Sequence, residues 1–237
     1  MTRSQFHAQQ ISRDRLFAAF PNCKELNDED LERILRRLAL VSLPAKQLLL
    51  LENDFGNCVY FILSGWIKIR TFDLEGKEVL LNLIGKGEIF GEMSVLDDVE
   101  RSTDAVAKTQ VLIGRLPGDD FQYLVDRSPQ FCKFVIRLIN KRLRIANRRL
   151  QFRDASATCR VADILLFLAQ TDISTAKNRS TLDLENIGHN DIASLSGLRR
   201  ETVSRTLTKL KKKGIAATGK NSIVIYDLEK LKNLTYM

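Results

Sequence analysis

The sequence predicts a mixed α+β chain with an antiparallel β-barrel or sandwich, a long helix and a helix-turn-helix with a small β-wing. Residues 46–116 contain short β-rich runs separated by glycines, a pattern of antiparallel barrels and sandwiches. Residues 129–153 follow a helical repeat of apolar side chains, which favours one long helix. Residues 191–214 read as two helices joined by Ser196-Gly197-Leu198, the arrangement of a helix-turn-helix.

The composition limits the function classes. A length of 237 residues fits one large or two smaller domains, and 44% hydrophobic residues can form real cores. The net charge of +8 favours a polyanionic partner such as nucleic acid. We find no apolar run of about 18 residues, so we expect neither a membrane span nor a membrane partner. The first 17 residues have no apolar signal core, so a cytoplasmic location is expected.

The N-terminal half begins with a predicted amphipathic helix over residues 21–38, capped by Asn27 or Asp28. Between two of the β-rich runs, the segment DLEGKE (73–78) reads as a hairpin loop. The predicted strands are the runs LLLLE (48–52), CVYFIL (58–63), WIKIRTF (66–72), EVLLNLI (78–84) and VLIGRL (111–116).

The long helix begins after Ser128, a cap that precedes Pro129. It carries two apolar stripes that repeat at seven residues on nearly opposite faces. One face would cover the β-domain, and the other suits a two-stranded coiled-coil seam, which predicts a homodimer. The alternative is a helix buried on all sides in one core. The eight basic residues in 133–153 argue against it, because burying them is costly. The stripes are Ile136, Ile139, Leu143, Ala146 and Leu150, and Leu138, Ile145 and Phe152.

The C-terminal part predicts a helix over 159–171, a polar loop over 172–182 and the helix-turn-helix, whose second helix ends at Gly214. Residues 215–226 read as a hairpin with its turn at Gly219-Lys220-Asn221. We therefore predict three parts: 1–127 with the N-terminal helix and the β-domain, 128–155 with the dimerisation helix, and 156–237 with the winged helix-turn-helix.

The second helix of the motif predicts a contact with double-stranded DNA, because such a helix enters the major groove. Arg200 and Arg205 can each pair with a guanine, and Glu201 can accept from a cytosine amino group. Ser204 can donate or accept. A winged helix that contacts protein instead is the alternative. Phosphate contacts are expected from the basic residues Lys209, Lys211, Lys212, Lys213 and Lys220.

The segment LSGLRRETVSRTL (195–207) resembles the recognition helix of the CRP/FNR family of bacterial transcription regulators, whose usual form is G-x-S-R-E-T-V-x-R. The resemblance implies base reading by Arg200, Glu201 and Arg205, and by Ser204 as in the FNR branch. It also implies a palindromic operator with TGTGA-like half-sites, and RNA polymerase as a partner. Arg199 stands where the family usually has serine, which loses a helix cap worth about 1 kcal/mol and adds a phosphate contact.

Upstream, residues 52–69 and 75–103 resemble the cyclic-nucleotide-binding β-roll of the same family. The marker is Gly91-Glu92-Met93-Ser94 followed by Arg101-Ser102-Thr103. The resemblance implies that Arg101 holds the cyclic phosphate with two parallel bonds, that Ser102 adds a hydroxyl and an N–H, and that Glu92 accepts from a ribose hydroxyl. Members that bind no ligand often lack the arginine, so its presence favours an effector.

The identity of the effector depends on the long helix. In the cyclic-AMP receptor protein branch, adjacent threonine and serine hydroxyls hold the purine. The resemblance places Ala146 and Asn147 there, and Arg142 at a basic position near the ligand. Cyclic AMP is the expected effector, but Asn147 also suits guanine or a dinucleotide.

The remaining arginines of the long helix are not explained by the resemblance. They indicate either an additional anionic ligand, an acidic protein partner near this helix, or a solvated flank. The set is Arg137, Arg142, Arg144, Arg148, Arg149 and Arg153.

Other functions have less support. Cys23, Cys58, Cys132 and Cys159 lack paired spacing, so we expect reduced thiols and no metal. An FNR-type iron–sulfur site would need clustered N-terminal cysteines. No nucleophile–base constellation is visible, so we do not expect an enzyme. A family member controlled by abundance or by a protein partner, without a small effector, remains the main alternative.

Overall fold

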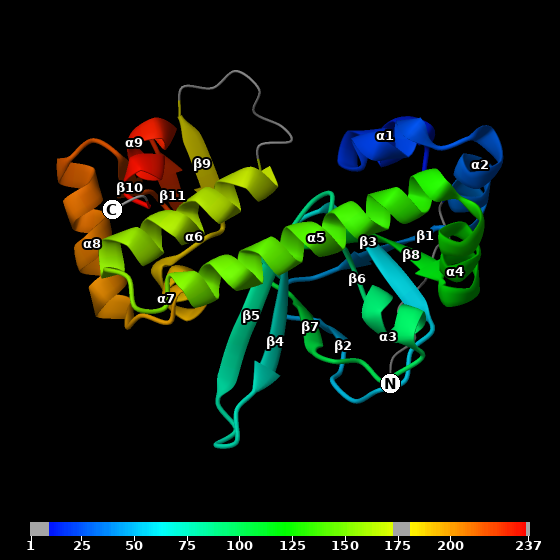
Figure 1. Cartoon of the computed structure of the whole chain (residues 1–237), viewed down its shortest axis with the longest axis horizontal. Coiled ribbons are helices and arrows are strands. Elements are labelled where there is room, and N and C mark those ends of the chain that lie inside the picture. Colours follow the sequence, from blue (N-terminus) through cyan, green and yellow to red (C-terminus); the bar gives the residue numbers. More distant parts are fainter. Residues whose placement is uncertain (1–9, 173–180, 236–237) are drawn as a thin grey trace. The chain divides into compact units, whose positions relative to one another are not determined.

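The structure is a computed structural model that describes residues 10–172 and 181–235. Its contacts divide the chain into two compact units, Met1–Glu78 with Leu83–Lys141, and Val79–Asn82 with Arg142–Met237. Figure 1 labels the helices and strands of both units.

Two antiparallel four-stranded sheets form the first unit, in the orders β1-β8-β3-β6 and β2-β7-β4-β5. Their facing sides bury a shared apolar cluster that includes Ile62, Ile67, Ala105 and Ile113. The predicted antiparallel β-domain is therefore confirmed, whereas β1, β6 and β7 were not predicted. The strands are β1 (Ala39–Leu43), β2 (Leu48–Leu50), β3 (Cys58–Ser64), β4 (Ile67–Phe72), β5 (Glu78–Ile84), β6 (Ile89–Phe90), β7 (Asp104–Ala107) and β8 (Val111–Pro117).

The predicted helix over 21–38 is wrong in its first part. Residues Pro21–Glu25 form a 3-10 turn, η1, and α2 covers only Asp28–Arg37. The reason is the cap: Asn27 is extended, and its side chain accepts the Asp30 N–H at 2.8 Å. A residue in that conformation cannot lie inside a helix.

Three further helices complete this unit around an aromatic core. They are α1 (Arg13–Ala19), α3 (Glu92–Asp97) and α4 (Gly118–Arg127). Phe20 packs edge-on against Phe61, with ring centroids 5.2 Å apart. This core fixes the helices beside β3.

The long helix is α5 (Pro129–Gln151), and Ser128 caps it by accepting the Phe131 N–H at 3.3 Å. Its first turns are buried and Leu138 packs against the first core, but one stripe is exposed. The alternative of a helix buried on all sides is therefore wrong. The exposed side chains are Ile136, Ile139, Leu143 and Leu150.

The second unit contains the predicted helix-turn-helix and its wing. Gly197 adopts a left-handed conformation with φ +62° and ends α7, which allows the tight turn into α8. The strands order as β10-β11-β9, all antiparallel; β9 was not predicted, and most of the predicted loop over 172–182 lies outside the described residues. The elements are α6 (Ala157–Asp172), β9 (Leu182–Glu185), α7 (His189–Ser196), α8 (Arg200–Lys212), β10 (Ala216–Thr218), β11 (Ser222–Ile225) and α9 (Leu228–Asn233).

Candidate functional site

Arg101 is a charged side chain that is only 4% exposed. Its Nη1 donates to the Gly91 carbonyl and to the Ser94 hydroxyl, both at 2.5 Å, and its Nη2 donates to the Cys58 carbonyl at 2.9 Å. Its Nε has no hydrogen-bond partner among the described residues. These bonds fix the orientation of the guanidinium and leave its Nε–Nη2 edge with donors for a further acceptor.

Glycines keep side-chain atoms away from this guanidinium. A Cβ at Gly56 would lie 2.6 Å from Nη2 and 2.8 Å from Nε, and one at Gly91 would lie 2.8 Å from Nη1. A buried cation with no carboxylate partner normally costs free energy. An anion with two oxygens on the Nε–Nη2 edge would offset that cost, so these residues fit a cyclic phosphate.

The structure brings some of the predicted ligand residues together. Gly91, Ser94 and Arg101 are in direct contact, and the Ser94 hydroxyl accepts a hydrogen bond from Arg101. Glu92 is buried at the start of α3. The Ser102 hydroxyl is exposed and lies 3.8 Å from the Met93 sulfur.

The remaining predicted ligand residues are Thr103, Arg142 and Asn147. Thr103 is half-buried beside Ser102, and its contact with a ligand stays a prediction. Arg142 and Asn147 lie on the part of α5 that belongs to the second unit, so their ligand contacts also stay predictions.

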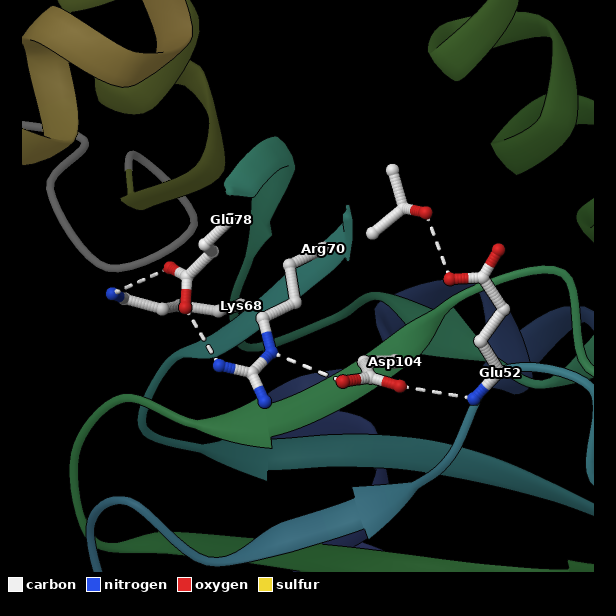
Figure 2. A network of polar contacts seen from close by, with 6 residues as sticks. Glu52, Lys68, Arg70, Glu78 and Asp104 are labelled. Atoms are coloured by element: carbon white, nitrogen blue, oxygen red, sulfur yellow. Dashed lines mark hydrogen bonds and ion pairs between the residues drawn. The ribbon is translucent and has the colours of Figure 1, made fainter. Parts of the chain in front are cut away.

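A charged network joins the labelled residues of Figure 2, which are Glu52, Lys68, Arg70, Glu78 and Asp104. Asp104 is 2% exposed, and its carboxylate accepts from Arg70 Nε at 3.1 Å and from the Glu52 N–H at 2.9 Å. Arg70 Nη1 also donates to Glu78 at 2.6 Å. The segment after Glu52 in turn bonds the Arg101 backbone: the Asn53 N–H donates to the Arg101 carbonyl at 2.8 Å.

We expect Arg70→Gln to lower the free energy of unfolding of this unit by about 3 kcal/mol, because it leaves the Asp104 carboxylate buried without its cation. Denaturant titration of the purified protein measures the change. Lys68→Gln is the matched control: Lys68 lies on the same strand and meets Glu78 at 3.6 Å, but makes no bond to Asp104, so the loss should stay below about 1 kcal/mol. Equal losses for both variants would contradict the assignment.

The second candidate surface is the exposed face of α8. Val203, Thr206, Leu207 and Leu210 are buried in the second unit, so the opposite side of the helix faces solvent. Arg199 precedes α8 and its side chain forms no capping bond, as predicted. Of the predicted DNA-contacting residues, Ser204 is half-buried, and the exposed ones are Arg199, Arg200, Glu201, Arg205, Lys209 and Lys220.

Contacts that the sequence did not indicate hold this surface in place. Arg160 of α6 donates to the Ser196 carbonyl at the end of α7. His189 Nε2 lies 2.8 Å from the Thr218 hydroxyl and joins α7 to the wing. Burial, and then the charge of Arg200, lowers the pKa of His189, so its ring is neutral at pH 7.

Within residues 10–172 and 181–235, no group of three or more His, Cys, Asp and Glu side chains could hold a metal ion. No helix in the described part of the chain is both long and apolar enough to span a bilayer. All four cysteines are free thiols, and burial raises the pKa of Cys23 to about 12.

Comparison with known proteins finds a match for the β-domain and another for the helix-turn-helix. Residues 40–128 match the cyclic nucleotide-binding domain, and residues 159–234 match the Crp-like helix-turn-helix domain. The cyclic AMP receptor protein of Thermus thermophilus is 33% identical over 186 residues, which cover 78% of this chain and 82% of that one. A CRP-like cAMP-activated global transcriptional regulator of Mycobacterium tuberculosis is 30% identical over 83% of this chain and 88% of its own. The solved structure of a CRP/FNR-family transcriptional regulator, also from Thermus thermophilus, is 28% identical, with a TM-score of 0.64 and coverage of 84% and 98%.

Proposed function

The chain belongs to the CRP/FNR family of transcription regulators, and from this premise we propose that it is a homodimeric regulator of transcription gated by cyclic AMP. The observation that carries the gating is the buried Arg101 guanidinium, whose Nε has no hydrogen-bond partner among the described residues. Arg101 would bind the cyclic phosphate, Glu92 the ribose hydroxyl and Ser102 a further phosphate oxygen. The same proposed binding segment includes Gly91, Met93 and Thr103.

Cyclic AMP is proposed over other cyclic nucleotides because the relatives at 30–33% identity are named for cyclic AMP. Asn147 would hold the adenine through its amide, and Arg142 would lie near the phosphate side. Cyclic GMP and cyclic di-GMP are the competing ligands, since an amide can donate and accept toward guanine as well.

The exposed apolar stripe on α5 supports the homodimer. Four apolar side chains of this stripe are exposed in the described part of the chain: Ile136, Ile139, Leu143 and Leu150. Two such stripes can pack as a coiled-coil seam. A dimer would place two α8 helices in successive major grooves, about 34 Å apart. We propose TGTGA-like half-sites as the operator, read by Arg200, Glu201, Ser204 and Arg205.

The remaining assignments follow from this role. We propose RNA polymerase as a protein partner and the cytoplasm as the location. Catalysis on the effector is not part of the proposal, and chromatography of cyclic AMP incubated with the protein tests this. An unchanged nucleotide is the expected result.

Calorimetric titration of the purified protein with cyclic AMP, cyclic GMP and cyclic di-GMP tests the gating. We expect heat from cyclic AMP at one site per protomer. We also expect binding to a TGTGA palindrome to tighten about 5- to 150-fold with cyclic AMP, the usual range of allosteric coupling. If none of the three ligands gives heat of binding, the result would favour the alternative, a family member controlled by its abundance or by a protein partner.

An acidic protein partner or a second anionic ligand on α5 has less support from the structure. Several arginines of this helix already have intrachain partners: Arg137 meets Glu25 at 3.7 Å, Arg149 donates to the Leu81 carbonyl, and Arg148 pairs with Asp163. Replacing Arg148 and Arg149 together and measuring effector affinity, dimerisation and partner binding would reveal any such contact.

A further inference from the structure

One intrachain contact of the α5 arginines is the ion pair between Arg148 and Asp163. Arg148 lies in the last turn of α5, and its Nε donates to the Asp163 carboxylate on α6. Its Nη2 also lies 3.2 Å from the Thr235 hydroxyl after α9. Asp163 is only 6% exposed, whereas the Arg148 side chain is 44% exposed. One arginine thus joins the end of α5 to two elements of the DNA-binding unit.

The same helix, α6, also holds the turn of the helix-turn-helix. Arg160 donates to the Ser196 carbonyl, and a Cβ on Gly197 would lie 2.9 Å from Arg160 Nη2. Arg160 and Asp163 are three residues apart, so they lie on one face of the helix. That face therefore contacts the end of α5 through Asp163 and the turn before α8 through Arg160.

The ionised form of Asp163 does not stabilise the fold. Burial raises its pKa, although the charges of Arg148 and Arg149 act in the opposite direction. A carboxyl whose folded pKa is raised stabilises the fold only while it is protonated, and that contribution is lost as the pH rises through the folded pKa.

We propose that Arg148 is a positioning residue that passes the state of α5 to the DNA-reading helix, with α6 as the connecting element. The inference rests on the proposed function, because Asn147, the residue proposed to hold the adenine, is the immediate neighbour of Arg148 in α5. A shift of α5 that brings Asn147 to the base also moves Arg148, and the ion pair carries the shift to α6 and to the turn at Ser196. Effector binding and operator binding are then linked through this pair.

The test compares Arg148→Gln with Arg144→Gln, an exposed arginine one turn earlier on the same helix. Each variant loses one positive charge, so general attraction to DNA falls equally. Operator affinity is measured with and without cyclic AMP, together with the affinity for cyclic AMP and the thermal midpoint. In the wild type, cyclic AMP should tighten operator binding about 5- to 150-fold, the usual range of allosteric coupling. In Arg148→Gln we expect this tightening to be about tenfold smaller or absent. Cyclic AMP affinity should change less than about threefold, and Arg148→Lys should recover most of the tightening.

The outcomes separate this inference from the proposed function. If the wild-type protein binds no cyclic AMP, the proposed effector is wrong. The positioning role of the ion pair is then tested by operator affinity without effector. This affinity should differ by at least about fivefold between Arg148→Gln and Arg144→Gln. If the two variants match each other in both states, or if Arg148→Gln loses only thermal stability, the ion pair has no positioning role.

Discussion

Replacing Arg101 with glutamine should lower the affinity for cyclic AMP by at least about 100-fold and remove the effect of the nucleotide on operator binding. The variant loses both donors of the Nε–Nη2 edge, and each charge-assisted hydrogen bond is worth about 1.5–3 kcal/mol. Two such bonds correspond to about two to four powers of ten in affinity. Calorimetry with cyclic AMP and operator titration measure the two losses.

Arg101→Lys gives a sharper comparison, because an ammonium keeps the charge but cannot form the parallel pair of bonds. Its affinity should fall between those of the wild type and Arg101→Gln. Both variants also remove donors from the Gly91, Ser94 and Cys58 oxygens, so the fold needs a separate check. Binding to DNA without nucleotide and far-ultraviolet circular dichroism provide it. Affinity within about threefold of the wild type in a folded Arg101→Gln protein would mean that the phosphate is held elsewhere.

The sequence predicted the site residues whose chemistry is local and missed those whose partners are distant. Gly91, Ser94 and Arg101 lie within eleven residues and follow a recognisable spacing. The Cys58 carbonyl could not be predicted, because it is a backbone atom brought to Arg101 by the pairing of distant segments. Gly56 was not predicted as a site residue, although a Cβ at this position would lie 2.8 Å from Arg101 Nε.

The same reasoning applies to the ionic contacts. Arg70 and Asp104 are 34 residues apart and meet because β4 pairs with β7; no sequence period links them. The arginines of α5 were recognised as unusual, but Asp163, the partner of Arg148, lies inside an apolar stretch of α6 where no sequence pattern marks it. Three helices of the DNA-binding unit, α6, α7 and α8, were in contrast predicted from the apolar period, the glycine turn and the basic face. The last helix, α9, was not predicted.

Replacing Glu201 with glutamine should change which operator is preferred, and should do so without weakening DNA binding in general. Glutamate accepts from the cytosine amino group, whereas glutamine pairs with adenine through N6 and N7. Affinity for a TGTGA palindrome should fall about tenfold or more, since one base contact is worth about 1–3 kcal/mol. A library of half-site variants, read by binding and sequencing, should show the preference moving toward an A·T pair at one symmetric position.

The matched comparison is Lys209→Gln on the same exposed face of α8, proposed to contact a phosphate. Removing a phosphate contact weakens binding to all sequences by a similar factor and lowers the salt slope by about one. Glu201→Gln removes a negative charge near DNA, so its affinity for unrelated DNA should rise slightly while its specificity falls. Because the two variants change net charge in opposite directions, a shared electrostatic effect cannot produce both results. If Glu201→Gln bound every half-site variant more tightly by one common factor, Glu201 would only repel the DNA phosphates and would contact no base. Base reading would then depend on Arg200, Ser204 and Arg205 alone.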